Sequence, residues 1–186
     1  MMPQRLQREE YLKKLIAFQD KNIIKIITGI RRCGKSTLME IFQDHLRSTG
    51  VENSQILHIN FEDFDYRPLR DPAALHSYIT ERMARNRMTY VFLDEIQHVP
   101  DWQDVVDSLH LRKNLDIYIT GSNAYLLSSE IATLISGRYV EIKMLPLSFR
   151  EFVSATGGEA NLPKAYRQYV ESSSFPYALA LLDHPK

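Results

Sequence analysis

The sequence is short of cysteine, of net charge and of long apolar runs, and each shortage excludes a class of protein. Its one cysteine, Cys33, allows neither an intramolecular disulfide nor a zinc site built on a cysteine cluster. Lysine and arginine together number 23, as do aspartate and glutamate, so the chain lacks the basic excess of a dedicated nucleic-acid-binding protein. No segment approaches the roughly 20 apolar residues of a membrane span, and the polar N-terminus has no signal-peptide-like apolar stretch. We therefore expect a cytoplasmic protein that makes no membrane contact.

What the sequence does contain is the composition of a globular domain. Hydrophobic residues make up 44% of the 186 residues and charged residues 25%, which is enough apolar material for a buried core. Short β-branched or apolar runs alternate with helical periodicity, which is typical of an α/β fold with a mainly parallel sheet. The expected strands are 22–28, 55–61, 90–94, 115–120 and 139–145. Helices are expected at 8–19, from the loop after the first strand to Gly50, from Pro72 through Met83, from Pro100 through Leu109, and at 124–135.

The pattern changes after residue 145. Shorter helical pieces follow, and the apolar run FPYALALL near the end has no evident partner within the chain. The sequence therefore predicts a core at residues 1–145. Residues 146–186 are expected to begin a helical lid or linker region of a longer protein.

One segment matches the phosphate-binding pattern G-x-x-x-x-G-K-[ST], between a β-branched strand and an amphipathic helix. In such a loop the backbone N–H groups turn inward, and the helix that follows adds the positive end of its dipole. We expect the Lys35 ammonium between the β- and γ-phosphates of ATP, and the Ser36 hydroxyl on Mg²⁺. The expected nucleotide-binding residues are Gly29, Ile30, Arg31, Arg32, Cys33, Gly34, Lys35, Ser36 and Thr37.

Cys33 lies inside this loop and admits two interpretations. It is a small residue that fits a crowded turn, the usual role of a lone cysteine. Alternatively, Arg31, Arg32 and the helix end favour its thiolate, so that oxidation would block the entry of phosphate.

A pair of adjacent carboxylates, Asp94 and Glu95, ends the apolar run at 90–94. In P-loop ATPases the aspartate at this strand end supports Mg²⁺, and a neighbouring glutamate can act as general base on the attacking water. Small-molecule kinases and simple GTPases generally lack this second carboxylate, and the chain has no N-K-x-D guanine motif. Hydrolysis of ATP, with Glu95 as base, is therefore favoured, although a preference for GTP is not excluded.

The run at 115–120 is followed by a polar tip. A polar side chain there can contact the γ-phosphate and the attacking water, and we choose Asn123 for this role. Ser122 and Thr120 are competitors, and Asn123 is also a good helix N-cap.

Five segments carry a resemblance to a known family: GIRRCGKSTL, YVFLDEIQHVPDW, IYITGSNAYLL, SGRYVEIKMLPLSFREF and SSFPYAL. Together they resemble the bacterial and archaeal AAA-like P-loop ATPases of uncharacterised function, which carry a separate C-terminal domain. The resemblance implies a parallel five-stranded sheet in the order 2-3-4-1-5, flanked by helices, with a short helical segment after Pro146. It assigns Lys35, Ser36 and Thr37 to phosphate and magnesium, Asp94 to the metal, Glu95 to the base and Asn123 to a polar sensor.

The same resemblance gives a role to Arg138. It matches a characteristic arginine that can serve as an arginine finger, within one chain or between chains, which in other enzymes changes the rate 10³–10⁵-fold. The alternative is a strand-edge arginine that pairs with a surface carboxylate.

The sequence thus favours a domain that binds ATP and hydrolyses it with Mg²⁺ to drive a conformational switch or an assembly. Two alternatives stay open: a nucleotide-gated switch with negligible turnover, and a DNA-associated ATPase whose DNA contacts come from a region outside this sequence. The expected partners are ATP or ADP and a second copy of the chain or another protein.

Overall fold

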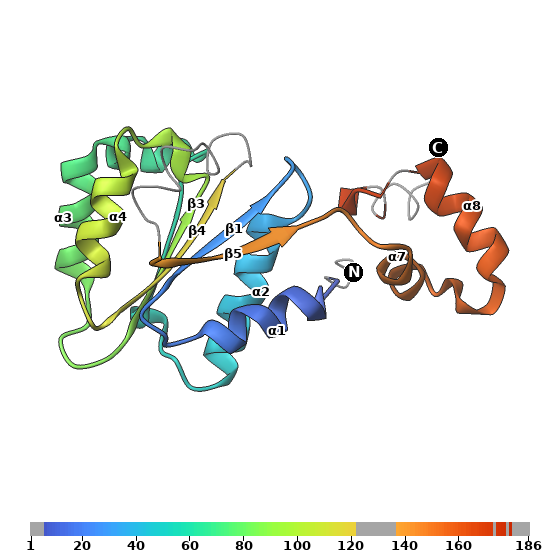
Figure 1. Cartoon of the computed structure of the whole chain (residues 1–186), viewed down its shortest axis with the longest axis horizontal. Helices are drawn as coiled ribbons and strands as arrows, with labels where there is room; N and C mark the ends of the chain where they lie inside the picture. Colours follow the sequence, from blue (N-terminus) through green and yellow to red (C-terminus); the bar gives the residue numbers. More distant parts are fainter. Residues whose placement is uncertain (1–5, 122–136, 173, 178, 180–186) are drawn as a thin grey trace.

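A parallel sheet of five strands forms the centre of the fold (Figure 1). Its strands lie in the order β2-β3-β4-β1-β5, and each neighbouring pair runs parallel. This confirms the order that the resemblance implies. The computed structural model describes residues 6–121, 137–172, 174–177 and 179. The strands are β1 (Ile24–Gly29), β2 (Ile56–Asn60), β3 (Thr89–Asp94), β4 (Leu115–Gly121) and β5 (Tyr139–Met144).

Helices cover both faces of this sheet (Figure 1). In β1, Ile26 packs into one core with Trp102, whereas the next residue, Ile27, packs into a second core with Phe42. This follows because successive side chains of a strand point to opposite faces. The first core lies under α3 (Pro72–Arg82) and α4 (Trp102–His110), and the second lies under α1 (Glu9–Phe18) and α2 (Lys35–Ser48).

A side-chain cap and a proline start α3. The Asp71 side chain accepts a hydrogen bond of 2.8 Å from the Ala74 N–H, and Pro72 occupies the first turn, where its missing N–H costs nothing. The end differs from the expectation by one residue. The helix stops at Arg82, and Met83 is its extended C-cap, packed at the margin of the core.

The connection after β2 contains regular structure. Its acidic residues lead into a 3₁₀ helix, Phe64–Arg70. The Asp63 carboxylate accepts a hydrogen bond of 3.0 Å from the Asp65 N–H at its start. The sequence shows no helical periodicity that would predict this 3₁₀ helix, because none of its residues is buried.

Two further helices, α7 (Phe149–Thr156) and α8 (Leu162–Ser172), follow β5 and lie beyond the end of the sheet (Figure 1). They confirm the helical pieces expected after Pro146. A capping box starts α7, in which the Ser148 hydroxyl accepts from the Glu151 N–H and the Glu151 carboxylate accepts from the Ser148 N–H. Aromatic contacts join the two helices, with the Phe152 and Tyr169 rings 5.4 Å apart.

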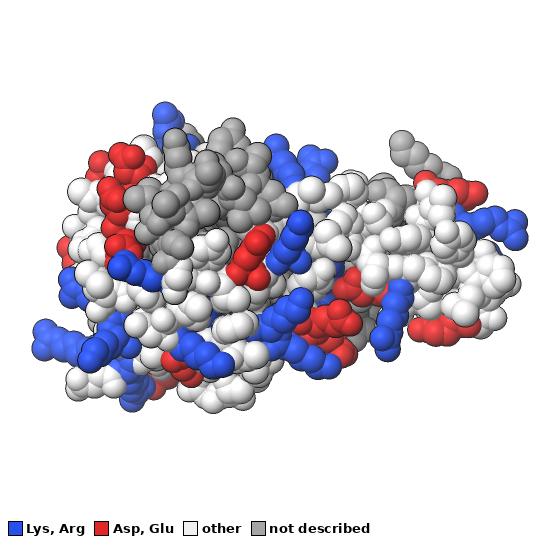
Figure 2. All heavy atoms as spheres, viewed as in Figure 1, with Lys and Arg blue, Asp and Glu red and all other residues white. Residues whose placement is uncertain are grey.

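The helix expected at 124–135 lies outside the described residues. Within the described part of the chain, no helix combines the length and the apolar character needed to cross a bilayer. The face shown in Figure 2 exposes both basic and acidic side chains.

Candidate functional site

The site forms at the carboxyl ends of β1, β3 and β4, where the loop between β1 and α2 meets the acidic pair after β3. Gly29 ends β1, and Gly34, with φ 102°, is the N-cap of α2. A Cβ on Gly29 would lie 2.5 Å from the Met144 carbonyl oxygen and 2.7 Å from the Cys33 sulfur. The loop therefore approaches β5 so closely that only glycine fits at this position.

Cys33 packs inward from this loop and is fully buried. Burial raises the pKa of its thiol, and the positive charges of Lys35 and Arg8 offset that only in part. The geometry supports the packing interpretation of Cys33. The oxidation hypothesis needs a thiolate, which this apolar setting disfavours.

Lys35 begins α2 and turns its ammonium back into the loop. Its Nζ lies 3.4 Å from the Gly29 carbonyl oxygen and 3.4 Å from Glu95 Oε1, with the side chain almost fully buried. Ser36 and Thr37 follow in the first turn of α2, half-buried and exposed respectively. The structure therefore brings together Lys35 and Glu95, two residues that the sequence analysis assigns to one candidate site.

Glu95 is held by its backbone and by a neighbour. Its φ of 55° is unusual for a residue other than glycine, and such conformations gather at functional sites. Its N–H donates to the Thr120 hydroxyl at 2.9 Å, and the Gln97 amide donates to its Oε2 at 2.6 Å. These contacts fix one carboxylate oxygen and leave Oε1 facing Lys35.

Asp94 is fully buried at the end of β3. Its Oδ1 accepts a hydrogen bond from the Thr120 hydroxyl, whereas Oδ2 has no hydrogen-bond partner among the described residues. A buried carboxylate oxygen without a partner is costly and indicates a missing donor or cation. Mg²⁺ fits this donor set, because it is typically held by one or two carboxylates, phosphates and water rather than by a protein cage.

Of the three polar candidates near the end of β4, the structure describes Thr120, which lies within the strand. Its hydroxyl joins the two acidic residues, since it accepts from the Glu95 N–H and donates to Asp94. Asn123, the sequence-based choice, and Ser122 lie outside the described residues.

Arg138 is not brought to this site within the chain. It directly precedes β5, and its carbonyl accepts from the Ile24 N–H at the start of β1. The site lies by Gly29 and Met144, at the other end of both strands, about 20 Å away at the usual rise of a strand. The half-exposed Arg138 side chain pairs with Asp107 of α4, which matches the surface-pair alternative.

With this geometry established, a family model described as an AAA domain matches residues 21–153. The chain belongs to this AAA domain family. Its strand order and the position of its glycine-containing loop between β1 and α2 agree with that assignment. The AAA domain is therefore a nucleotide-binding P-loop domain of the ATPase type.

Two curated relatives are uncharacterised proteins. One, from Haemophilus influenzae, is 44% identical over 184 residues, which cover 97% of this chain and 46% of the relative. The other, MJ1544 from Methanocaldococcus jannaschii, is 33% identical over 175 residues, which cover 87% of this chain and 37% of the relative. The chain thus spans less than half the length of each of these relatives.

Solved structures share the fold at low sequence identity. The S. cerevisiae Hsp104 complex with casein gives a TM-score of 0.65 at 16% identity, over 95% of this chain and 36% of that chain. A Walker-type ATPase of Pyrococcus abyssi gives a TM-score of 0.60 at 18% identity, over 98% of this chain and 69% of that chain. These likenesses confirm the P-loop ATPase fold of the AAA domain.

Further residues belong to the loop or make contacts with the loop or with Glu95. Arg31 is exposed and forms an ion pair of 3.1 Å with the exposed Glu62. Gln97 and Arg8, which contact Glu95 and the loop respectively, carry no assignment from the sequence. For Gln97, the signal in the sequence is its position two residues after the acidic pair. For Arg8, an arginine that stands before a helix, the sequence offers no such signal.

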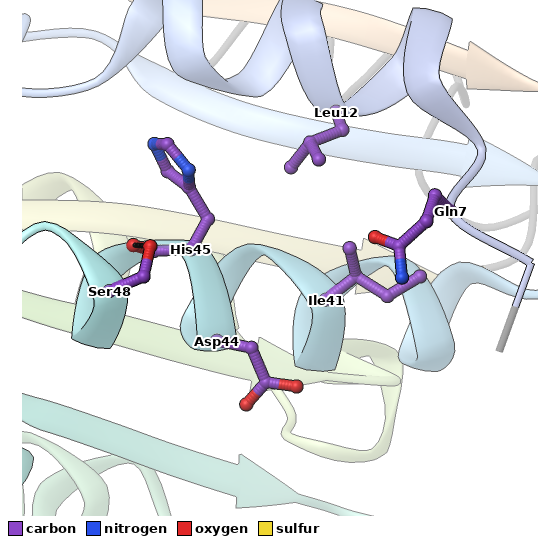
Figure 3. Close-up of a pocket in the computed structure, with 6 residues that line it drawn as sticks. All are labelled: Gln7, Leu12, Ile41, Asp44, His45 and Ser48. Carbon is purple, nitrogen blue, oxygen red and sulfur yellow. Dashed lines mark hydrogen bonds between the residues drawn. The ribbon is translucent and has the colours of Figure 1, made fainter. Parts of the chain in front are cut away.

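A separate hollow of about 260 Å³ lies between α1 and α2 (Figure 3). Its lining on α2 begins at Ile41, past the first turn, so it is distinct from the phosphate loop. The residues that line it are Gln7, Leu12, Ile41, Asp44, His45 and Ser48.

Proposed function

We propose that this AAA domain hydrolyses ATP with Mg²⁺ and uses the cycle to drive a conformational switch or an assembly. The observation that carries the proposal is the unpartnered Oδ2 of buried Asp94, next to the Lys35–Glu95 pair. In the proposed complex, residues 29–37 hold the phosphates, and Ser36 and Asp94 hold the metal. Bound Mg-ATP supplies the phosphoanhydride bond that is cleaved and a cation that neutralises developing charge.

Lys35 has to change partners in this scheme. Its two contacts, both 3.4 Å, are longer than the 2.7–2.9 Å usual for charge-assisted hydrogen bonds. Phosphate oxygens offer this buried ammonium stronger partners than Glu95 and a carbonyl group do. We therefore propose that Lys35 leaves Glu95 when nucleotide binds.

Glu95 would then be free to act as general base. Gln97 and Thr120 hold its side chain and backbone, so the released Oε1 stays at the site. There it can accept a proton from the attacking water, a contribution worth 10²–10⁴-fold in comparable enzymes. Before nucleotide binds, the Lys35 ammonium occupies that oxygen and keeps the base out of use.

Binding is tested first by isothermal titration with Mg-ATP. Lys35→Ala is expected to weaken the affinity by roughly 10- to 100-fold, because a charged hydrogen-bond donor is lost. The matched control is Lys13→Ala, which removes an exposed lysine of α1 and should leave the affinity unchanged. Equal binding by the wild type and Lys35→Ala would refute the phosphate-loop assignment.

Turnover is tested by phosphate release in single-turnover conditions. Glu95→Gln is expected to bind Mg-ATP normally and to hydrolyse it about 100-fold or more slowly. Glu81→Gln, which changes an exposed carboxylate of α3, serves as control. Wild-type protein that binds but does not turn over would instead support the nucleotide-gated switch.

A further inference from the structure

Arg8 makes an unusual set of contacts for a residue so near the N-terminus. It precedes α1 in a left-handed conformation, with φ 47° and ψ 47°, and its side chain is 4% exposed. Its backbone carbonyl accepts hydrogen bonds from the N–H groups of Tyr11 and Leu12. A buried, strained and charged residue of this kind persists only where its surroundings determine it strongly.

The guanidinium of Arg8 joins three separate parts of the chain. Nη1 donates to the Cys33 carbonyl oxygen of the phosphate loop at 3.4 Å. Nη2 donates to the Leu145 carbonyl oxygen, directly after β5, at 2.6 Å. Nε lies 2.8 Å from Glu151 Oε1 on α7.

Tyr11 supports this arrangement from α1. The Arg8 guanidinium carbon lies 4.8 Å from the centre of the Tyr11 ring, within the range of a cation–π contact. The Tyr11 hydroxyl accepts a hydrogen bond of 3.2 Å from the Leu145 N–H. Both backbone polar groups of Leu145 are therefore bound by the N-terminal segment.

The contact with Cys33 bears on the phosphate loop through peptide geometry. In a trans peptide the carbonyl and the following N–H point in opposite directions. Because Arg8 holds the Cys33 carbonyl, the Gly34 N–H points away from Arg8. Arg8 thus sets the direction of one amide in the loop that is proposed to receive phosphate.

The contact with Glu151 connects Arg8 to the start of α7. Glu151 uses its second carboxylate oxygen, Oε2, to accept hydrogen bonds of 2.8 Å from the N–H and the hydroxyl of Ser148. A single carboxylate therefore caps α7 and pairs with the arginine that holds the loop. No other carboxylate among the described residues pairs with Arg8.

We propose that Arg8 is a positioning residue that couples the phosphate loop to the helical segment 145–172. The coupling rests on the proposed nucleotide-binding function. The same guanidinium holds a loop carbonyl, the junction after β5 and the cap of α7, so a shift of any one changes the hydrogen bonds of the others. Since coupling free energies are reciprocal, nucleotide binding would stabilise α7, and a change at α7 would alter nucleotide affinity.

The decisive measurement is amide hydrogen exchange of residues 30–34 and 146–156, with and without Mg-ADP. Mg-ADP is the probe because it binds the loop without requiring turnover. In the wild type, exchange in 146–156 is expected to slow when Mg-ADP is added. In Arg8→Ala that difference should vanish, and affinity should fall by about tenfold, within the usual range of coupling. A purely structural role would raise exchange equally in both states and preserve the difference.

Two variants keep the test independent of a folding defect. Glu151→Gln retains the cap, because glutamine also serves at this position, but it loses the ion pair with Arg8. Without nucleotide, it is expected to speed exchange in the loop amides 30–34, and Glu171→Gln, an acidic position on α8, is not. Arg8→Lys keeps the charge with one compact head group, so affinity should stay within about threefold of the wild type while the coupling is lost.

The outcomes separate the two proposals. If the wild type does not bind Mg-ADP, the nucleotide-binding proposal fails, and the loop exchange of Glu151→Gln still decides the coupling. If the wild type binds but Arg8→Ala keeps the full Mg-ADP effect on 146–156, the coupling is overturned. Unchanged loop exchange in Glu151→Gln would overturn it as well.

Discussion

Gly29 shows at the scale of a single residue how little space the phosphate loop has. The clash that a Cβ would make is with a backbone carbonyl of β5 and a buried sulfur atom, and neither can move without disturbing the core. Gly50, by contrast, has a positive φ of 97° but open space around it. The two glycines are thus required for different reasons.

Gly29→Ala is expected to destabilise the protein by about 1–3 kcal/mol, the usual cost of overpacking a filled site, and to weaken nucleotide binding. Gly50→Ala should cost about 1–2 kcal/mol through its backbone conformation alone and leave binding unchanged. Urea unfolding and titration with Mg-ATP check the pair. If Gly29→Ala bound Mg-ATP normally, the loop would be shown to tolerate a displacement of β5 by the added Cβ.

His58 of β2 gives a prediction about pH. Burial lowers the pKa of its imidazole, with smaller opposing effects from Asp94 and Glu40 and a lowering one from Arg47. The unfolded chain, with a pKa near 6.5, then binds more protons than the folded protein below that value. The contribution of neutral His58 to stability is present above about pH 6.5 and is lost as the pH falls toward the lowered folded pKa.

His58→Gln is therefore expected to lose less stability than the wild type between about pH 7 and pH 5. The Gln43 side chain, 3.2 Å from His58 Nδ1, can hydrogen bond to either residue. Unfolding midpoints across that range measure the effect. Parallel pH curves for the two proteins would contradict the assignment.

At the scale of elements, β1 and β4 are joined by a buried charge pair at their amino ends. Lys25 and Asp116 are both buried and in contact. Asp116 also accepts hydrogen bonds from the Asp20 N–H at 2.9 Å and the Tyr118 hydroxyl at 2.8 Å. This pair attaches the segment after α1 to the sheet, at the end of the strands opposite the loop between β1 and α2.

Asp116→Leu is expected to destabilise the protein by about 3–5 kcal/mol, because it leaves the Lys25 charge buried without its carboxylate. The double variant Lys25→Met with Asp116→Leu should recover much of that loss, since no lone charge remains. Urea unfolding of both, with the single Lys25→Met, completes the cycle. A double variant no more stable than Asp116→Leu would show that the pair itself is required.

Prediction from sequence succeeds where an element is buried on a regular period. Strand β3 is buried along its whole length because helices cover both faces of the sheet, and α2 shows its buried positions at helical spacing. It fails where structure depends on distant partners. The 3₁₀ helix at 64–70 buries none of its residues. The partners of Arg8, two carbonyl acceptors and one carboxylate in an ion pair, lie 25, 137 and 143 positions away. Of the site, Lys35, Asp94 and Glu95 follow from motifs, whereas the bridging role of Thr120 needs the fold.

For the whole molecule, the position of Arg138 decides how an arginine finger could work. It lies at the amino ends of the strands, whereas Lys35 lies at their carboxyl ends, so Arg138 cannot reach the site of its own chain. It remains a proposal that Arg138 acts on a second copy. Its pairing with Asp107 at the surface leaves it accessible for such a contact.

We expect Arg138→Ala to match the wild type in turnover at low protein concentration, where the chain is dispersed. It should fall behind by an order of magnitude or more once the wild type associates, as measured beside sedimentation velocity. Asp107→Asn, which frees Arg138, should not share the defect. Equal turnover at every concentration would leave Arg138 with its surface pair alone.

The path of the N-terminal segment has a practical consequence for anyone who wishes to produce a smaller version of this protein. A chain that began at β1 would keep every strand, the glycine loop and both acidic residues, and would look complete by its motifs. It would lack Leu15, which is buried against α2, and the guanidinium that reaches Cys33, Leu145 and Glu151. Such a truncation would keep the motifs intact, but it would expose the apolar helix face that Leu15 covers and would remove the contact that holds the loop.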